Sequence, residues 1–143
     1  HDRLRDDHGR RRRQRRAGTI VNVTSNVTLA PFPLVACYTA SKTAIEGFTE
    51  SLELELKNFD VRIKLVEPGY GPTTSFTANG QQRMQGLIPP AYESFAQSVF
   101  AEFASVTAAT TEADVAEAVF KAANDVSSQL RFPAGADAVA LVQ

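Results

Sequence analysis

A β-branched run, a long amphipathic segment and a second β-rich run follow one another in the first half of the chain, and this order limits the possible folds most. Residues 19–24 (TIVNVT) are typical of a strand buried on both faces, as in a parallel sheet. The segment from Val35 or Ala36 to about Lys57 repeats apolar residues at spacings of three and four, which predicts a helix. Residues 61–66 (VRIKLV) predict the second strand. Such a βαβ unit has a right-handed crossover and parallel strands, and ligands bind at the carboxyl ends of those strands.

The predicted helix has an apolar side and an acidic side. We expect the apolar side to contact the core through Ala40, Ala44, Ile45, Phe48, Leu52 and Leu56. Four glutamates mark the side expected to face water, namely Glu46, Glu50, Glu53 and Glu55. The same helix carries a patch of small residues at Ala40, Ala44 and Gly47.

The second half of the chain is less regular. Residues 70–109 contain several Gly and Pro breaks among apolar residues, and two interpretations stay open: a lid over a ligand site, or a pair of surface helices. Residues 111–114 (TEAD) resemble a capping box that opens a helix to about Asn124. Residues 130–133 (LRFP) predict a short final strand, and a helical end follows it.

Charge is distributed unevenly along the chain. Residues 1–17 hold eight Arg and three Asp, which leaves seven of the fifteen basic and thirteen of the sixteen acidic residues to the remainder. We expect this Arg-rich segment to be a mobile tail, because it has almost no apolar residue to bury. Nucleic-acid binding by the tail is the weaker alternative, since arginines alone would give salt-sensitive, unspecific contacts.

Several classes of site are disfavoured by composition. Both histidines, His1 and His8, lie in the Arg-rich segment, which argues against a Ser-His-Asp triad and against a metal centre in the folded part. The single cysteine, Cys37, allows no internal disulfide and suits a reducing compartment. No apolar run reaches the roughly 20 residues of a membrane span. We therefore expect a cytoplasmic protein without a metal and without a membrane partner.

Three side chains form the strongest chemical pattern in the sequence. Ser25 follows the first predicted strand, and Tyr38 comes thirteen residues later, four residues before Lys42. Residues four apart on a helix share a face and are about 6 Å apart along its axis. A phenol is a poor base at neutral pH, but a nearby ammonium stabilises its phenolate form. Tyr38 is therefore a candidate general acid and base for an alcohol or carbonyl oxygen.

In order and spacing, these motifs resemble the catalytic half of the classical short-chain dehydrogenase/reductase family. That half contains N-x-S-S, then Y-x-x-x-K, then P-G-x-V-x-T, which here read as residues 22–25 (NVTS), 38–42 (YTASK) and 68–73 (PGYGPT). Residues 131–137 (RFPAGAD) are similar to the family's closing strand and turn. The resemblance covers roughly residues 18–143.

The resemblance implies hydride transfer between a nicotinamide cofactor, NAD or NADP, and a small-molecule carbonyl or alcohol. Ser25 would hydrogen-bond the substrate oxygen, and Tyr38 would give or take the proton. Lys42 would favour the phenolate form of Tyr38 and bind the hydroxyls of the nicotinamide ribose, so that Tyr38 and Lys42 also contact the cofactor. Their alternative roles are structural: a turn hydroxyl, a half-buried aromatic ring and a solvated charge.

The Pro-Gly segment would complete the cofactor side of the site. The backbone after Pro68 and Gly69 would approach the nicotinamide, and Thr73 would contact its carboxamide or the adjacent phosphate. The sequence departs from the family pattern at Thr24, which replaces a serine, and at Gly71, which stands where a valine is usual.

The family's Gly-rich dinucleotide cradle and its N-N-A-G segment have no counterpart before Ser25. We therefore expect a Rossmann-like parallel sheet with flanking helices that represents the C-terminal half of the doubly wound fold, with residues 18–143 forming a partial domain. Activity of this chain alone is expected to be weak or absent. The alternative is a non-catalytic fragment that acts as an oligomerisation or interaction partner; the family also implies a homo-oligomer.

Overall fold

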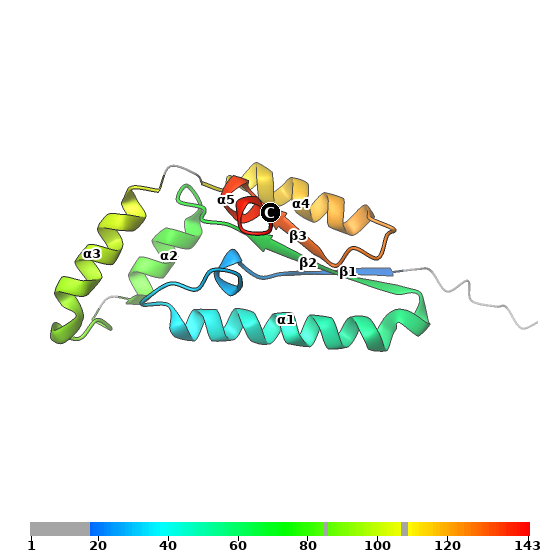
Figure 1. The fold of residues 1–143 in the computed structure, drawn as a ribbon, viewed down its shortest axis with the longest axis horizontal. Coiled ribbons are helices and arrows are strands. Elements are labelled where there is room, and N and C mark those ends of the chain that lie inside the picture. Colours follow the sequence, from blue (N-terminus) through cyan, green and yellow to red (C-terminus); the bar gives the residue numbers. More distant parts are fainter. Residues whose placement is uncertain (1–17, 85, 107–108) are drawn as a thin grey trace, which may run out of the picture.

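Three parallel strands form the centre of the computed structural model, in the spatial order β1-β2-β3 (Figure 1). They are β1 (Gly18–Val23), β2 (Val61–Pro68) and β3 (Arg131–Ala134). The structure describes residues 18–143 except 85 and 107–108, so the predicted Arg-rich tail, residues 1–17, lies outside the described residues.

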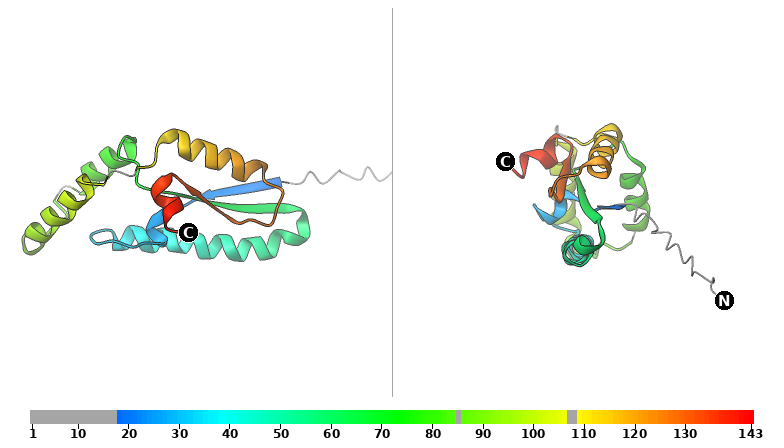
Figure 2. Two further views of the ribbon diagram at one scale, coloured as in Figure 1. Left: turned by 45° about the horizontal axis from the view of Figure 1, so that its top comes forward. Right: turned by 90° about the vertical axis from the view of Figure 1, so that its right-hand side faces the viewer.

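Helices cover both faces of this sheet and extend past its carboxyl end. The helix α1 (Ala36–Leu56) lies on one face and α4 (Glu112–Asn124) on the other (Figures 1 and 2). The helices α2 (Ser75–Met84) and α3 (Glu93–Ala104) lie beyond the strand ends. Short elements complete the fold: the 3₁₀ turns η1 (Asn26–Thr28), η2 (Lys57–Phe59) and η3 (Pro90–Tyr92), and the helix α5 (Ala136–Ala140). The predicted parallel sheet with flanking helices is confirmed.

Most predicted boundaries agree with the structure to within one or two residues. The strand β2 is two residues longer than predicted, because its last residues pair with β3 in the register Leu65↔Arg131 to Pro68↔Ala134. The predicted capping box is present, since Thr111 N–H donates to Asp114 Oδ2 at 2.8 Å and Asp114 N–H donates to Thr111 Oγ1 at 3.2 Å. Of the two interpretations of residues 70–109, the pair of helices is present as α2 and α3.

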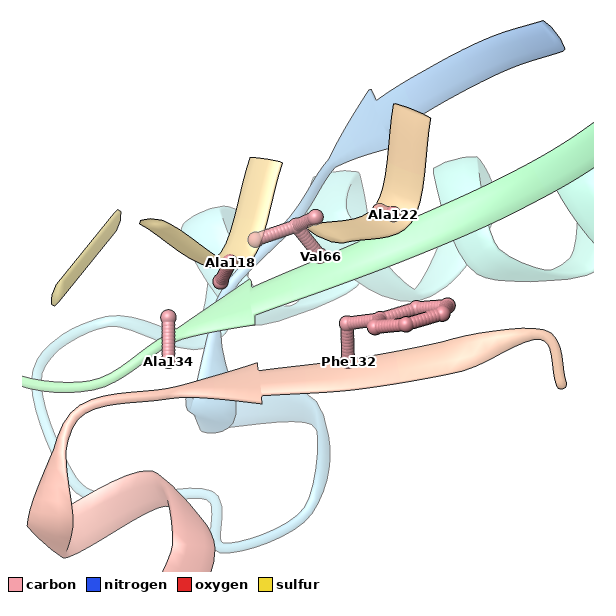
Figure 3. Packing of buried hydrophobic residues seen from close by; sticks show 5 residues of the cluster. All are labelled: Val66, Ala118, Ala122, Phe132 and Ala134. Carbon is pink, nitrogen blue, oxygen red and sulfur yellow. The ribbon is translucent and has the colours of Figure 1, made fainter. Parts of the chain in front are cut away.

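The main apolar core lies between the sheet and α4. Figure 3 shows its five buried members, Val66, Ala118, Ala122, Phe132 and Ala134. The two helix positions are alanines, whose small side chains let α4 approach β2 and β3 closely around the ring of Phe132. No described helix is both long and apolar enough to pass through a bilayer.

The first strand exposes apolar side chains at the edge of the sheet. Ile20 is 39% exposed and Val23 is 41% exposed. Among the described strands β1 pairs with β2 alone and forms one edge of the sheet. The β-branched pattern is typical of a strand buried on both faces, but in a partial sheet the first strand is expected to expose an edge and an apolar face, and it does so here.

The two sides of α1 also differ from the prediction. Glu46 is buried although it was expected to face water, and Phe48 is 60% exposed although it was expected to face the core. The small residues Ala40, Ala44 and Gly47 are exposed as well. Glu46 faces inward, where it pairs with a partly exposed cation on β3.

That cation is Arg131, which contacts three carboxylates from two elements. Its Nη1 lies 3.1 Å from Glu46 Oε2 and also contacts Glu67 Oε1, and its Nη2 lies 2.7 Å from Glu50 Oε1. Burial raises the pKa of Glu67 above its ordinary value, and the nearby guanidinium of Arg131 offsets only part of that rise. Burial alone would lower the pKa of Arg131, but hydrogen bonds to the surrounding carboxylates raise it. The cluster joins α1, β2 and β3.

A second cation, Lys64 on β2, is buried one residue before the position that pairs with Arg131. Lys64 donates to Asp125 Oδ1 at 2.7 Å and to the carbonyl oxygens of Ser127 and Gln129 at 2.9 and 2.6 Å. These three bonds satisfy all three hydrogens of the ammonium group, so its burial leaves no donor unpaired. Lys64 thereby fixes the loop that leads from α4 into β3.

Glu67→Gln tests the electrostatic cost of the Arg131 cluster. The glutamine keeps the volume and an acceptor oxygen for Arg131 but cannot ionise. Because the folded-state pKa of Glu67 lies above its ordinary value of 4.5, the folded protein loses stability as pH rises from about 4.5 through the raised pKa, and the loss is complete above it. The variant should lack this loss, so its free energy of unfolding relative to wild type should increase over that pH range, as measured by urea denaturation. Glu55→Gln, at an exposed position on α1, is the matched control. A Glu67→Gln difference that is flat or falls with pH would contradict the assignment.

Candidate active site

A pocket of about 460 Å³ lies at the carboxyl ends of β1 and β2. Ser25, Tyr38 and Lys42 line it together with Pro68 and Gly69, so five of the six predicted site residues meet in one cavity. The sequence places them there because Ser25 directly follows β1, Pro68 ends β2, and the first turns of α1 pass beside both. Size and position are those of an ordinary small-molecule site in a parallel sheet.

Tyr38 and Lys42 share one face of α1, as their spacing predicts. The Lys42 ammonium nitrogen lies 5.6 Å from the centroid of the Tyr38 ring. The same ammonium makes a long hydrogen bond of 3.5 Å to the carbonyl oxygen of Val23, at the end of β1. Lys42 is thus oriented between the strand end and the ring of Tyr38.

Ser25 is held by the turn that follows β1. Its extended backbone caps η1, and its Oγ accepts a hydrogen bond from Val27 N–H at 3.3 Å. Next to it, Thr28 Oγ1 donates to the carbonyl oxygen of Ser25 at 2.9 Å. A serine hydroxyl that accepts one bond can still donate its own hydrogen, so Ser25 is able to bond a ligand oxygen.

Asp137 is a pocket residue that sequence reasoning missed. Its carboxylate accepts from Tyr70 N–H at 2.6 Å, from Thr110 Oγ1 at 2.7 Å and from Asn26 Nδ2 at 3.4 Å. It therefore connects α5 to η1 and to the loop after β2. The available signal was the Gly-Ala-Asp sequence after the last strand, which was interpreted only as a closing turn.

The structure does not bring Thr73 into this pocket. Its exposed hydroxyl lies 3.3 Å from Glu112 Oε2, at the start of α4. The next residue, Thr74, lines the pocket instead, with its hydroxyl donating to the carbonyl oxygen of Gly71 at 2.8 Å. Contact between Thr73 and a cofactor therefore stays a prediction.

Aromatic rings form much of the remaining wall. Phe32 and Phe103 have ring centroids 4.4 Å apart, and Tyr70 lies 5.5 Å from Phe103. Phe76, on α2, lies 5.7 Å from the ring of Tyr38. All five residues line the pocket, so α2 and α3 contribute apolar rings to the cavity that the polar groups at the strand ends also line.

Comparison with known proteins agrees with this architecture. The sequence profile described as short chain dehydrogenase matches residues 10–84, slightly more than half of the chain. The chain belongs to the short-chain dehydrogenase family. An uncharacterized oxidoreductase of Schizosaccharomyces pombe is 32% identical over 124 residues, which are 86% of this chain and 51% of the relative. The chain thus spans about half the length of that curated relative.

Solved structures of short-chain dehydrogenases agree as well. One from Streptomyces avermitilis superposes with a TM-score of 0.62 at 27% identity, covering 87% of this chain and 44% of that structure. An NAD⁺-bound xylitol dehydrogenase gives a TM-score of 0.60 at 27% identity, covering 82% and 48%. These structures share the fold of the described residues over a little under half of their own length.

Gly69→Ala tests the close contact between the loop after β2 and Asp137. A Cβ at Gly69 would overlap the Asp137 carboxylate, so the carboxylate must leave Tyr70 N–H and Thr110. We expect a destabilisation of about 1–3 kcal/mol in urea denaturation. The control is Gly47→Ala, since a Cβ there meets nothing within 4 Å and alanine should stabilise the helix by roughly 0.5–1 kcal/mol. Equal stabilities of the two variants would argue against the contact.

Proposed function

We propose that this chain is the catalytic portion of an NAD(P)-dependent oxidoreductase that interconverts a carbonyl and an alcohol by hydride transfer. The proposal depends on one observation above the others: Ser25, Tyr38 and Lys42 line a single pocket with Pro68 and Gly69. A hydroxyl donor, a phenol and an ammonium around one cavity are suited to binding an oxygen atom and moving a proton to or from it.

Each side chain has a distinct task in the proposed reaction. In the reducing direction Ser25 donates a hydrogen bond to the carbonyl oxygen and holds it beside Tyr38. Tyr38 transfers its hydroxyl proton to that oxygen as negative charge develops there, and Lys42 stabilises the phenolate that remains. In the oxidising direction the phenolate of Tyr38 takes the alcohol proton back. The Asp137 carboxylate bonds to Tyr70 N–H, Thr110 and Asn26, and Asp137 is therefore a positioning residue for the loop after Gly69.

The nicotinamide cofactor, NAD or NADP, supplies the hydride when bound. Lys42 has hydrogens beyond the one donated to Val23 O, which fits binding of ribose hydroxyls at the same pocket. Two solved short-chain dehydrogenases with the same fold contain NAD and NADP, respectively, from Burkholderia phymatum and Burkholderia cenocepacia.

The chain alone should turn over slowly or not at all. It spans about half of its relatives, and cofactor contacts remote from the reacting atoms help to orient those atoms. The purified 143-residue chain, with NADH or NADPH and a ketone, should oxidise cofactor far more slowly than a full-length relative under the same conditions. Turnover comparable to that relative would overturn this expectation.

Tyr38→Phe tests the catalytic assignment in a complete fold. Residues 18–143 would replace the matching part of the Streptomyces avermitilis short-chain dehydrogenase, and ketone reduction would be followed by NADH and NADPH absorbance. Loss of the acid/base group should lower the rate about 10²–10⁴-fold. Tyr92→Phe, at an exposed tyrosine outside the pocket, should leave the rate unchanged. If the two variants behaved alike, Tyr38 would not be the proton donor.

A second candidate function is assembly with another chain without catalysis. The observation that favours it is the exposed face of α1, where Phe48 is 60% exposed beside the small residues Ala40, Ala44 and Gly47. A homo-oligomer of this chain in the cytoplasm would cover that face. Light scattering discriminates, because a defined stoichiometry supports assembly whereas a monomer or a polydisperse aggregate opposes it.

A further inference from the structure

Part of the pocket wall is aromatic, and its rings come from four separate segments. Phe32 follows η1, Tyr70 follows β2, Phe76 belongs to α2 and Phe103 to α3. Their ring centroids lie 4.4–5.7 Å from a neighbouring aromatic ring, which is the range of favourable edge and offset contacts. The wall therefore offers ring faces and edges to whatever enters beside Tyr38.

Part of this wall is open to solvent rather than closed on itself. Phe76 is 63% exposed and Phe32 is 36% exposed, although both line the cavity. Covering apolar surface contributes about 25 cal/mol per Å², so a ligand that lies against these rings gains binding free energy from them. A sugar or a small polar ketone would gain little there.

Charged groups are scarce around the cavity. Among the described lining residues only Lys42 and Asp137 carry charge. The Asp137 carboxylate already accepts three hydrogen bonds, and Lys42 lies at the strand end beside Tyr38, the position assigned above to phenolate and cofactor. A carboxylate or phosphate placed against the aromatic wall would lose its hydration without gaining a counter-ion.

We infer that the substrate is an uncharged ketone, or the corresponding secondary alcohol, in which the reacting carbon carries a flat aromatic or comparably apolar ring system. This inference rests on the proposed function, because the carbonyl oxygen is placed at Ser25 and Tyr38. The ring system then lies on Phe76 and Phe103. The cavity volume of about 460 Å³ accommodates one or two fused rings and is too small for a large chain to be fully enclosed.

The test measures binding, so that it does not depend on turnover. Isothermal titration of the 143-residue chain would compare 2-acetylnaphthalene with its 6-carboxylate, which has the same ketone and ring but a charge. We expect the neutral ketone to bind about tenfold more tightly or better, since the charge must be desolvated against the rings. Phe76→Ala and Phe103→Leu should each weaken binding of the neutral ketone about 2–10-fold.

The control is Phe48→Ala, at an exposed phenylalanine on α1 outside the pocket, which should not change the affinity. Phe76 is itself largely exposed, so its replacement should preserve the fold, and circular dichroism would verify this for each variant. Undetectable binding of the neutral ketone, equal affinity for the carboxylate, or unchanged affinity of both pocket variants would overturn the inference. Selective binding combined with no Tyr38-dependent turnover in the complete fold would instead overturn the proposed function alone.

Discussion

One guanidinium group sets the geometry on which the candidate site depends. Arg131 bonds to Glu67 at the end of β2 and to Glu46 and Glu50 on α1. Glu46 lies one helical turn after Lys42, and its Oε1 lies 2.5 Å from Thr28 Oγ1, whose one hydrogen is shared between Glu46 and the carbonyl oxygen of Ser25. Because arginine presents its donors in a rigid planar fork, the cluster fixes helix, strand and turn relative to one another. Both elements that carry proton-handling residues are therefore tied to β3.

Asp137 has a similar role on the other side of the pocket. Its carboxylate joins η1, the loop after β2 and Thr110, whose one hydroxyl hydrogen is shared between Asp137 and the carbonyl oxygen of Ala134, 3.0 Å away. Gly135, with a φ of 93°, makes the turn that brings α5 back to this position, and a side chain there would overlap Thr110. Asp137 thus holds polar segments that line the pocket, whereas the Arg131 cluster holds α1 and β2 from outside the pocket lining. The aromatic wall formed by Phe76 and Phe103 belongs to neither cluster. Such a wall can vary in sequence without disturbing the acid/base residues.

The sequence predicts those parts of this arrangement that depend on local patterns. Helical periodicity gives α1 to within a residue, the Thr111 capping box gives the start of α4, and the i,i+4 spacing places Tyr38 beside Lys42. The errors come from contacts between distant positions. The burial of Glu46 depends on Arg131, 85 residues away, and no periodicity within α1 indicates it. The exposure of Thr73 depends on the path of the loop after Pro72, which directs Thr74 into the pocket instead. Asp137 was missed for the same reason, since all of its partners are distant in sequence.

The proposed reaction has two requirements, a positioned proton donor and an aligned hydride donor, and the contacts described above support only the first. The contacts that position Ser25, Tyr38 and Lys42 are all made between described residues. They are the Arg131 cluster and the hydrogen bond from Lys42 to the end of β1. Orientation of the hydride donor has no comparable support there, because the pocket offers the cofactor one ammonium and a backbone loop. Transition-state stabilisation depends on fixing both reactants, and a proton donor in the correct place does not compensate for a hydride that is poorly aligned. Groups that align the hydride donor could reach the pocket from strands paired with the exposed edge of β1, beside Ile20 and Val23.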